Sequence, residues 1–339
     1  MRQAMLYEKK DGNANCFLCA HRCRIPEGKR GVCRVRENVG GTLYSLVYGR
    51  AIAANPDPIE KKPLFHYKPG TDSYSIATIG CNFRCSFCQN WDISQRSKSG
   101  GEIIGVEKTP EGVVDEAIES GCESVSYTYT EPTIFFEYAY DTAKIAKEKG
   151  LGNVFVTNGY MTAETISECE GWLDAANVDL KSFSDEFYRR VCGGSLDPVL
   201  QSLKGMVNAD IWVEVTTLVV PGRNDSDDEL RQIANFIGKE LGEHVPWHIS
   251  RFHPDYKETK LNPTPIETIH RAKEIGIDEG LEYIYTGNVP HEDAENTRCP
   301  NCNELLIERF GFNVTSNSIR DSRCPACSTK IEGVDLNGN

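Results

Sequence analysis

The sequence predicts an α/β protein built around an incomplete (β/α) barrel of the TIM type, with one cysteine-rich module before the barrel and another after it. Between about residues 73 and 287, short β-rich runs alternate with amphipathic helical stretches, which predicts parallel strands joined by right-handed helical crossovers. Polar residues also gather where the expected strands end, and βα barrels build their sites at that rim. Six or seven such units are too few for an eight-fold barrel. An open sheet with the same connectivity would place its ligand at the same edge.

The expected elements follow one another along this region. Runs rich in β-forming residues predict strands at 73–80, 123–130, 153–159, 175–183, 211–220, 245–252 and 281–287. Amphipathic stretches predict helices at 109–120, 133–150, 162–172, 197–209, 226–241 and about 265–275. The first helix carries its start signal in the sequence, with Thr109 as N-cap and Pro110 in the first turn.

Three modules follow from this pattern. We expect an N-terminal cysteine-rich, metal-binding module at 1–70, the barrel at 71–290 and a zinc-ribbon-like module at 291–339. The segment 57–70 contains Pro58, Pro63 and Pro69, and these prolines predict an extended linker. We expect this linker to hold the first module against the barrel, where it partly closes the mouth.

Charge and hydropathy narrow the class of protein. The chain has 339 residues and a formal net charge of −13, which disfavours extended contact with nucleic-acid phosphates. Its first thirty residues contain no apolar run, and no run of about 18 apolar residues occurs anywhere. We therefore expect a soluble, cytoplasmic protein that neither enters a membrane nor binds nucleic acid.

Cysteine is the most informative residue type. Of the fourteen cysteines, eleven fall into three close-spaced groups, a pattern that in an intracellular protein indicates metal sites rather than disulfides. The remaining three, Cys122, Cys169 and Cys192, are expected to be buried as small apolar side chains. The three groups are Cys16, Cys19, Cys23 and Cys33, then Cys81, Cys85 and Cys88, and finally Cys299, Cys302, Cys324 and Cys327.

The central group places three cysteines within eight residues, in the segment CNFRCSFC. A structural zinc site takes four protein ligands, so a zinc ion here would need a distant fourth ligand. A [4Fe–4S] cluster normally takes four thiolates, one for each iron, and three thiolates leave one iron open to a small molecule. The spacing therefore favours a [4Fe–4S] cluster held by Cys81, Cys85 and Cys88, with Phe87 beside a flat ligand, and a zinc loop is the alternative.

The two terminal groups predict further metal sites. The pairs CPNC and CPAC, 21 residues apart, are typical of a zinc ribbon, although a rubredoxin-like iron site uses similar knuckles. The N-terminal group consists of four cysteines and the adjacent His21, and both zinc and a second iron–sulfur cluster remain open for it.

A basic segment surrounds the N-terminal cysteines. Residues 22–36 contain six arginines and lysines but only one glutamate. This segment is either a solvated loop around a metal knuckle or a docking surface for an acidic protein such as a small electron carrier.

At the central cysteines, the sequence resembles the signature of the radical S-adenosylmethionine (SAM) superfamily. The resemblance implies that the fourth iron of the cluster is chelated by the amino and carboxylate groups of SAM. One electron from the cluster then cleaves the sulfonium to methionine and a 5′-deoxyadenosyl radical, which abstracts hydrogen. A reducing electron carrier of the flavodoxin or ferredoxin type is the implied partner.

Further short motifs resemble one branch of that superfamily, the activating enzymes of glycyl-radical proteins such as pyruvate formate-lyase. CQN follows the cluster loop, and VTNG, VDLK, LVVPG and RFHP occur downstream in the order found in those enzymes. Two positions depart from their pattern. Val156 stands where an acidic residue usually precedes TNG, which argues against a cation site there. Tyr129 and Thr130 replace the glycine pair before the SAM-binding glutamate.

A narrower resemblance covers nearly the whole chain. CFLCAHRC, GKRGVC, DPIEKKPLFHYKPG, YTYTEPT and the C-terminal cysteine pairs together resemble the radical SAM enzyme of the AmmeMemoRadiSam system. This pattern implies no particular substrate.

The resemblance and the strand ends together indicate which residues hold SAM. Alternation along NVDLK puts Asp179 and Lys181 on one face, where a charged pair inside a barrel needs partners such as the zwitterionic end of SAM. The alternatives are a self-satisfied Asp–Lys pair, a helix-start role for Glu131 and a structural role for His253. The expected cofactor-binding residues are Phe87, Thr130, Glu131, Thr157, Asn158, Asp179, Lys181 and His253.

We therefore expect a radical SAM enzyme, an oxidoreductase similar to the activating enzymes. Its cofactors would be a [4Fe–4S] cluster, SAM, a C-terminal zinc ion and an N-terminal metal. Its substrate is a protein or a small molecule, and activation of a glycyl-radical partner is one version of this function. The alternative is a non-enzymatic iron–sulfur or zinc protein for electron transfer or assembly, which leaves the charges at successive strand ends unexplained.

Overall fold

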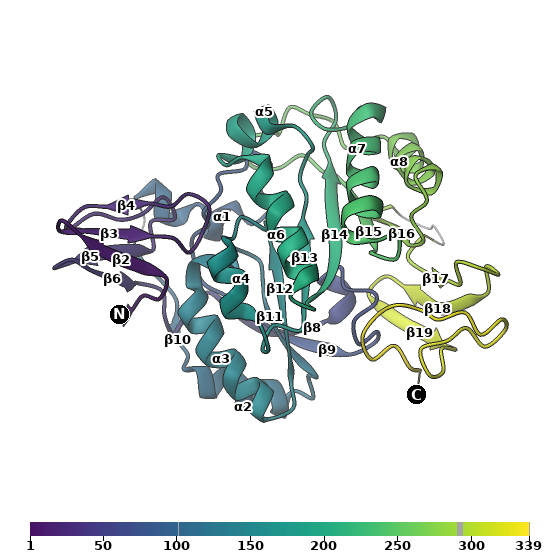
Figure 1. The fold of residues 1–339 in the computed structure, drawn as a ribbon, viewed down its shortest axis with the longest axis horizontal. Coiled ribbons are helices and arrows are strands. Elements are labelled where there is room, and N and C mark those ends of the chain that lie inside the picture. The colour runs from purple at the N-terminus through teal and green to yellow at the C-terminus, as the bar shows by residue number, and fades with distance from the viewer. Residues whose placement is uncertain (101, 290–293, 339) are drawn as a thin grey trace.

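The computed structural model describes residues 1–100, 102–289 and 294–338. Its centre is an eight-stranded sheet with the order β16-β15-β14-β13-β12-β11-β9-β8 (Figure 1). Seven of these strands run parallel, and β8 lies antiparallel to β9 at one edge. The strands are β8 (Ala53–Pro58), β9 (Asp72–Ala77), β11 (Ser124–Tyr127), β12 (Gly152–Thr157), β13 (Ala175–Asp179), β14 (Trp212–Val219), β15 (Trp247–Arg251) and β16 (Ile284–Gly287).

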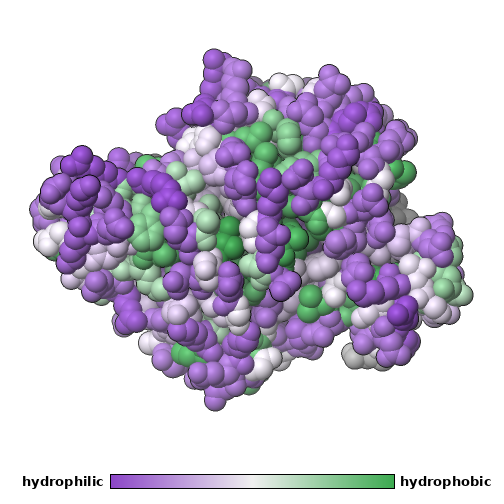
Figure 2. All heavy atoms as spheres, in the orientation of Figure 1, coloured by the Kyte–Doolittle hydropathy of each residue, from purple (hydrophilic) through white to green (hydrophobic). Residues whose placement is uncertain are grey.

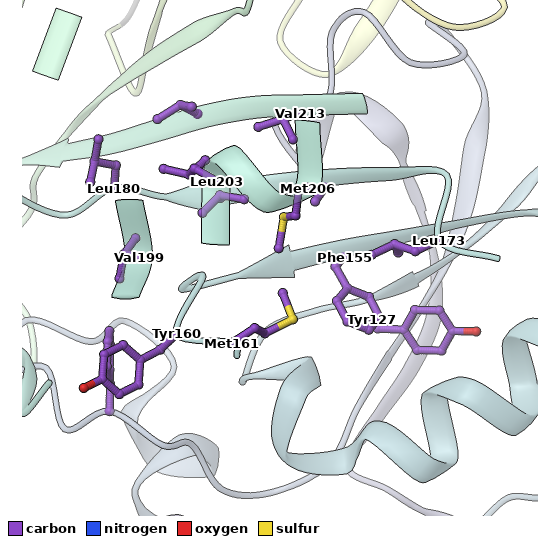
Figure 3. Close-up of a cluster of buried hydrophobic side chains, with 14 of the residues drawn as sticks. Tyr127, Phe155, Tyr160, Met161, Leu173, Leu180, Val199, Leu203, Met206 and Val213 are labelled. Carbon is purple, nitrogen blue, oxygen red and sulfur yellow. The ribbon is translucent and has the colours of Figure 1, made fainter. Parts of the chain in front are cut away.

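Helices connect the parallel strands and confirm the predicted alternation. Thr109 caps the first of them, because its Oγ1 accepts a hydrogen bond from the Gly112 N–H at 3.1 Å. Figure 3 shows Leu203 and Met206 in one apolar cluster with Phe155 and Val213. Among the described residues, no helix has both the length and the apolar character that a membrane span requires. The longer helices are α2 (Pro110–Glu119), α3 (Phe136–Glu148), α4 (Ala163–Cys169), α6 (Leu196–Asn208), α7 (Asp227–Phe236) and α8 (Ile266–Asp278), and α1 (Trp91–Ser94) and α5 (Asp185–Phe187) are single turns.

The edge strand β8 includes Asp57 and Pro58, the first two residues of the expected linker, and these two are extended as the sequence predicts. Two prolines, Pro56 and Pro58, lie within this strand, and an edge strand tolerates the missing N–H groups. The chain then makes a short 3-10 turn at Ile59–Lys61 (η1), and there the expectation of an extended linker is wrong. Within the described chain, β8 and β16 are the two edges of the sheet and do not pair with each other, so the sheet stays open.

The N-terminal residues form small antiparallel sheets at the left of Figure 1. Their apolar side chains, including Leu18 and Val35, belong to the same hydrophobic cluster as the central sheet, and Arg36 forms a buried ion pair with Glu137 of α3. The module is therefore packed against the barrel. Figure 2 shows that its outward edge is mostly hydrophilic. Its strands are β1 (Arg2–Gln3), β2 (Tyr7–Lys10), β3 (Asn13–Cys16), β4 (Arg24–Ile25), β5 (Arg36–Val39), β6 (Thr42–Ser45) and β7 (Arg50–Ala51), the last paired with β10 (Val106–Glu107).

The C-terminal residues form a three-stranded sheet of β17 (Thr297–Arg298), β18 (Leu305–Phe310) and β19 (Asn313–Asn317). Leu306 and Ile307 form a hydrophobic cluster with Tyr283 and Tyr285 from the end of the barrel. Arg309 also donates a hydrogen bond to the Phe65 carbonyl oxygen at 2.8 Å. The predicted module boundary at 290/291 lies outside the described residues.

His66 joins the segment after β8 to this C-terminal module. Its Nδ1 lies 2.7 Å from the Glu332 carbonyl oxygen, which can only accept, so Nδ1 carries the proton and Nε2 accepts from the Tyr285 hydroxyl at 2.7 Å. Burial lowers the pKa of His66 to about 4, although Glu214 acts in the opposite direction. The folded protein therefore keeps this ring neutral.

We expect stability to depend on pH through His66. The unfolded chain binds a proton at His66 below about pH 6.5, whereas the folded protein does so only near pH 4. Stability therefore falls as the pH drops through this window, by about 2 kcal/mol between pH 7 and pH 5. Melting temperatures of the wild type and His66→Gln at both pH values measure this term, because glutamine can donate and accept hydrogen bonds but does not titrate. Equal losses in the two proteins would show that His66 is not the source.

Candidate active site

The three central cysteines lie on the loop that follows β9. Gly80 begins this loop with φ of 102°, and a Cβ there would lie 2.8 Å from Val35 Cγ1, so the approach of the N-terminal module requires glycine. The sulfur atoms of the triplet do not all lie within 4.8 Å of one another in the described chain. Two thiolates on one zinc ion can be at most about 4.6 Å apart, twice the Zn–S bond. This spacing therefore does not suit a single zinc ion.

Residues from six neighbouring parallel strands meet above this loop. A cavity of about 260 Å³ is lined by the three cysteines and by side chains at or just beyond the ends of the strands from β11 to β15. The structure thus brings together most of the residues that the sequence predicts to hold SAM. Those that line the cavity are Phe87, Thr130, Glu131, Asn158, Asp179 and Lys181.

Glu131 is buried and bonded on both carboxylate oxygens. It accepts hydrogen bonds from the Thr133 N–H at 3.1 Å and from the Asn158 N–H at 2.8 Å. The Thr157 hydroxyl donates to it at 2.7 Å. Glu131 therefore caps the turn Pro132–Phe135 (η3) and also ties the end of β11 to the end of β12. Burial raises the pKa of this carboxyl group, and the hydrogen bonds act against that shift.

Asp179 and Lys181 form an ion pair at the end of β13. Lys181 Nζ lies 2.8 Å from Asp179 Oδ2, and the side chains are 14% and 36% exposed, the lower value belonging to lysine. Burial opposes the charge on Lys181, but Asp179 outweighs it and raises the pKa of the lysine. Both groups face the cavity, so an amino-acid zwitterion placed there meets one charge of each sign.

Asn158 and Thr157 have different positions at the end of β12. Asn158 Nδ2 donates to Asn82 Oδ1 at 2.7 Å and lies 3.8 Å from Cys81 Sγ, so it orients the cluster loop. Thr157 does not line the cavity and acts through its hydrogen bond to Glu131.

Tyr129 occupies one of the two positions where the activating enzymes have a glycine pair. It has φ of 62°, a conformation that costs a bulky residue energy and that glycine adopts freely. Its hydroxyl donates to Asp57, and Lys62 Nζ lies 4.8 Å from its ring centre. These contacts from β8 and the turn after it hold Tyr129 in place at the rim.

His253 lies apart from the cysteine triplet. It lines a second, larger cavity of about 1310 Å³ beside β15, β16 and the C-terminal module, rather than the cavity of the cysteines. The two cavities share Gln89, Thr216 and Ser250, so they adjoin at the ends of β14 and β15.

Sequence reasoning missed several residues of the smaller cavity. Thr216, Leu218 and Ser250 line it from β14 and β15. Thr216 and Ser250 are polar residues in the C-terminal halves of their strands, a signal that the sequence offers for uncharged as well as charged side chains. The structure also places Cys192 beside Cys85. Cys122, Cys169 and Cys192 are all buried, as the sequence predicts.

The four C-terminal cysteines form a compact group. Cys299 Sγ lies 3.5 Å from Cys327 Sγ, and Cys302 Sγ lies 3.6 Å from Cys324 Sγ. All four sulfur atoms lie within 4.8 Å of one another, the arrangement that one tetrahedral ion needs.

The basic segment is only partly a solvated surface. Arg36 is buried and paired with Glu137, so its assignment to an exposed basic loop is wrong. Arg22 pairs with Glu164. Arg24, Lys29 and Arg34 are exposed.

The geometry defines a class of protein: an α/β chain whose parallel strand ends carry three clustered thiols and an ion pair around one cavity. Residues 75–237 match the radical SAM superfamily. An uncharacterized protein of Methanocaldococcus jannaschii is 50% identical over 98% of this chain and 100% of its own length. The pyruvate formate-lyase 1-activating enzyme of Escherichia coli is 27% identical over 61% of this chain and 89% of its own length.

The solved structures agree on the fold. A radical SAM methyltransferase from Sphaerobacter thermophilus superposes with a TM-score of 0.52 and 17% identity, over 67% of this chain and 70% of the other. The chain belongs to the radical SAM superfamily. Membership implies an enzyme that uses a [4Fe–4S] cluster and SAM.

Proposed function

We propose that this protein cleaves SAM reductively at a [4Fe–4S] cluster held by Cys81, Cys85 and Cys88, and that it uses the product to abstract hydrogen from a substrate. The observation that supports this most strongly is the single cavity shared by three thiols and an ion pair of opposite charges. Bound together, the two cofactors supply one-electron cleavage of a sulfonium; the protein supplies position, charge and shielding.

The residues present fit both groups. Asn82 is buried beside Cys81, and its Nδ2 has no hydrogen-bond partner among the described residues, so a donor is available to a cluster sulfur. Burial raises the pKa of the Cys81 and Cys88 thiols, and these thiols would carry a charge only when bonded to a metal.

Each polar residue then has a role at a stated atom. Lys181 Nζ binds the SAM carboxylate, and Asp179 Oδ2, released from Lys181, accepts a hydrogen bond from an N–H of the SAM amino group. Glu131 keeps its bonds to Asn158 and Thr157 and holds the rim in shape. Phe87 is buried against the Phe187 ring, with centroids 6.0 Å apart, and covers the apolar side of the cavity.

The larger cavity is the proposed substrate site. It adjoins the SAM cavity and, at about 1310 Å³, exceeds the usual size of small-molecule sites, roughly 300–1,000 Å³. Phe310, which lines it, is 80% exposed, and exposed aromatic side chains commonly anchor protein partners. These features support a protein substrate, of which a glycyl-radical partner is one version. We further propose that the four C-terminal thiols bind zinc. The proposed reductant is a protein of the flavodoxin or ferredoxin type.

Anaerobic incubation with SAM and a strong reductant tests the proposal. We expect methionine and 5′-deoxyadenosine in equal amounts, because one sulfonium bond breaks for each electron delivered. Omitting the reductant is the control and should give neither product. Reduced, iron-loaded protein that leaves SAM intact would contradict the proposal and favour an electron-transfer or assembly protein.

A further inference from the structure

The four N-terminal cysteines converge on one small, largely enclosed cavity. Cys16 and Cys23 lie on neighbouring segments of the chain, and the Cys16 N–H donates to the Cys23 carbonyl oxygen at 2.9 Å. All four thiols line the cavity together with apolar side chains. These apolar residues are Leu18, Ile25, Val32 and Ile134.

The spacing of these sulfur atoms differs from that of the C-terminal group. No three of the four thiols lie mutually within 4.8 Å in the described chain, whereas all four C-terminal sulfur atoms do. Thiolates on one zinc ion are at most about 4.6 Å apart, so three of these thiols cannot share a zinc ion as they stand. A [4Fe–4S] cluster bonds each thiolate to a different iron and keeps the thiolates apart with its inorganic core.

Arg36 supplies a second, independent observation. It lines the same cavity and is only 2% exposed. Its terminal nitrogens donate hydrogen bonds to Glu137 and to the Met5 carbonyl oxygen. Its Nε has no hydrogen-bond partner among the described residues. A buried cation with a spare N–H beside four thiols suits an anionic sulfur cluster, because hydrogen bonds to cluster sulfurs stabilise it.

The cavity also adjoins the loop of the central cysteines. The Ser97 hydroxyl donates to the Cys33 carbonyl oxygen at 3.3 Å. Lys98 interacts electrostatically with both Cys33 and Cys81. The two cysteine groups are therefore neighbours in the fold.

We propose that Cys16, Cys19, Cys23 and Cys33 hold a second iron–sulfur cluster, of the [4Fe–4S] type, next to the cluster of the central triplet. Arg36, whose charge is paired with Glu137, offers its Nε–H to this cluster from the buried side. The exposed Arg24, Lys29 and Arg34 occupy the segment of chain that carries Cys23 and Cys33. This site does not depend on whether the central triplet binds SAM.

Metal analysis of anaerobically purified protein tests the proposal. We expect roughly eight iron atoms and about one zinc ion for each chain, and as many sulfide ions as iron atoms. Cys16→Ser and Cys33→Ser should each lower the iron content to roughly four and leave the zinc content unchanged. Cys122→Ser and Cys169→Ser are matched controls, because these buried cysteines lie outside all three groups, and should keep all the iron.

The triple variant C81A/C85A/C88A separates this proposal from the proposed function. It should retain roughly four iron atoms in the N-terminal site. If the triplet held no cluster, the wild type itself would contain roughly four, all of them lost in Cys16→Ser. Roughly four iron atoms with about two zinc ions in the wild type would overturn the second cluster. The metal content of the wild-type protein alone decides this outcome, so the test remains valid even if the Cys16→Ser variant misfolds.

Discussion

Replacing any one of Cys81, Cys85 and Cys88 by alanine is expected to abolish 5′-deoxyadenosine formation. Each thiolate bonds one iron of the proposed cluster, so a single loss leaves two irons without a protein ligand. The cavity offers no replacement ligand on the same loop, since its other polar side chains there are amides and a serine. The amount of 5′-deoxyadenosine should therefore fall to about the detection limit, not merely by a modest factor.

Product analysis of the three variants under reducing conditions measures this effect. Cys122→Ala and Cys169→Ala serve as controls for the removal of a buried cysteine and should cleave SAM at the wild-type rate. Cys192→Ala is unsuitable as a control, because this residue touches Cys85. Undiminished cleavage by any triplet variant would mean that SAM is bound and reduced elsewhere.

Lys181→Ala is expected to keep the cluster but weaken SAM binding about ten- to a hundred-fold. The loss of one charge-assisted hydrogen bond costs roughly 1.5–3 kcal/mol. Asp179 loses its partner as well, but its side chain is 36% exposed, so water can solvate the carboxylate and the fold should survive. Equilibrium binding of SAM to the reconstituted protein, with iron content measured in parallel, gives the result.

Lys204→Ala is the matched control for this variant. Lys204 forms an ion pair with Glu240 at 3.3 Å but does not line the SAM cavity. Its removal should leave SAM affinity unchanged. If Lys181→Ala also binds SAM normally, the Asp179–Lys181 pair is purely structural, which is the alternative that the sequence leaves open.

The alternation of strands and helices was predictable because it depends on local periodicity. Helix α2, with its cap at Thr109, lies where the sequence places it. Strand β8 was not predictable in the same way. Its two prolines argue against a strand, and only the edge position in the finished sheet makes them tolerable. Likewise, the pairing of Arg36 with Glu137 joins residues 101 positions apart, so no local pattern indicates that Arg36 is buried.

The candidate site was predictable where charge or cysteine marks it. Asp179 and Lys181 stand out because charges at the end of a barrel strand are costly without partners. Thr216 and Ser250 carry no such mark, since short hydroxyl side chains are common at strand ends. The hydrogen bonds of Glu131 to Thr157 and Asn158 depend on the register of β11 and β12, which sequence alone does not give.

The central claim is that three thiolates hold a cluster with one iron left open to SAM. The most direct test is the electron paramagnetic resonance spectrum of the anaerobically reduced protein, recorded with and without SAM. We expect SAM to change the signal of the wild-type protein and to leave that of C81A/C85A/C88A unchanged. A wild-type spectrum unaffected by saturating SAM would contradict the claim.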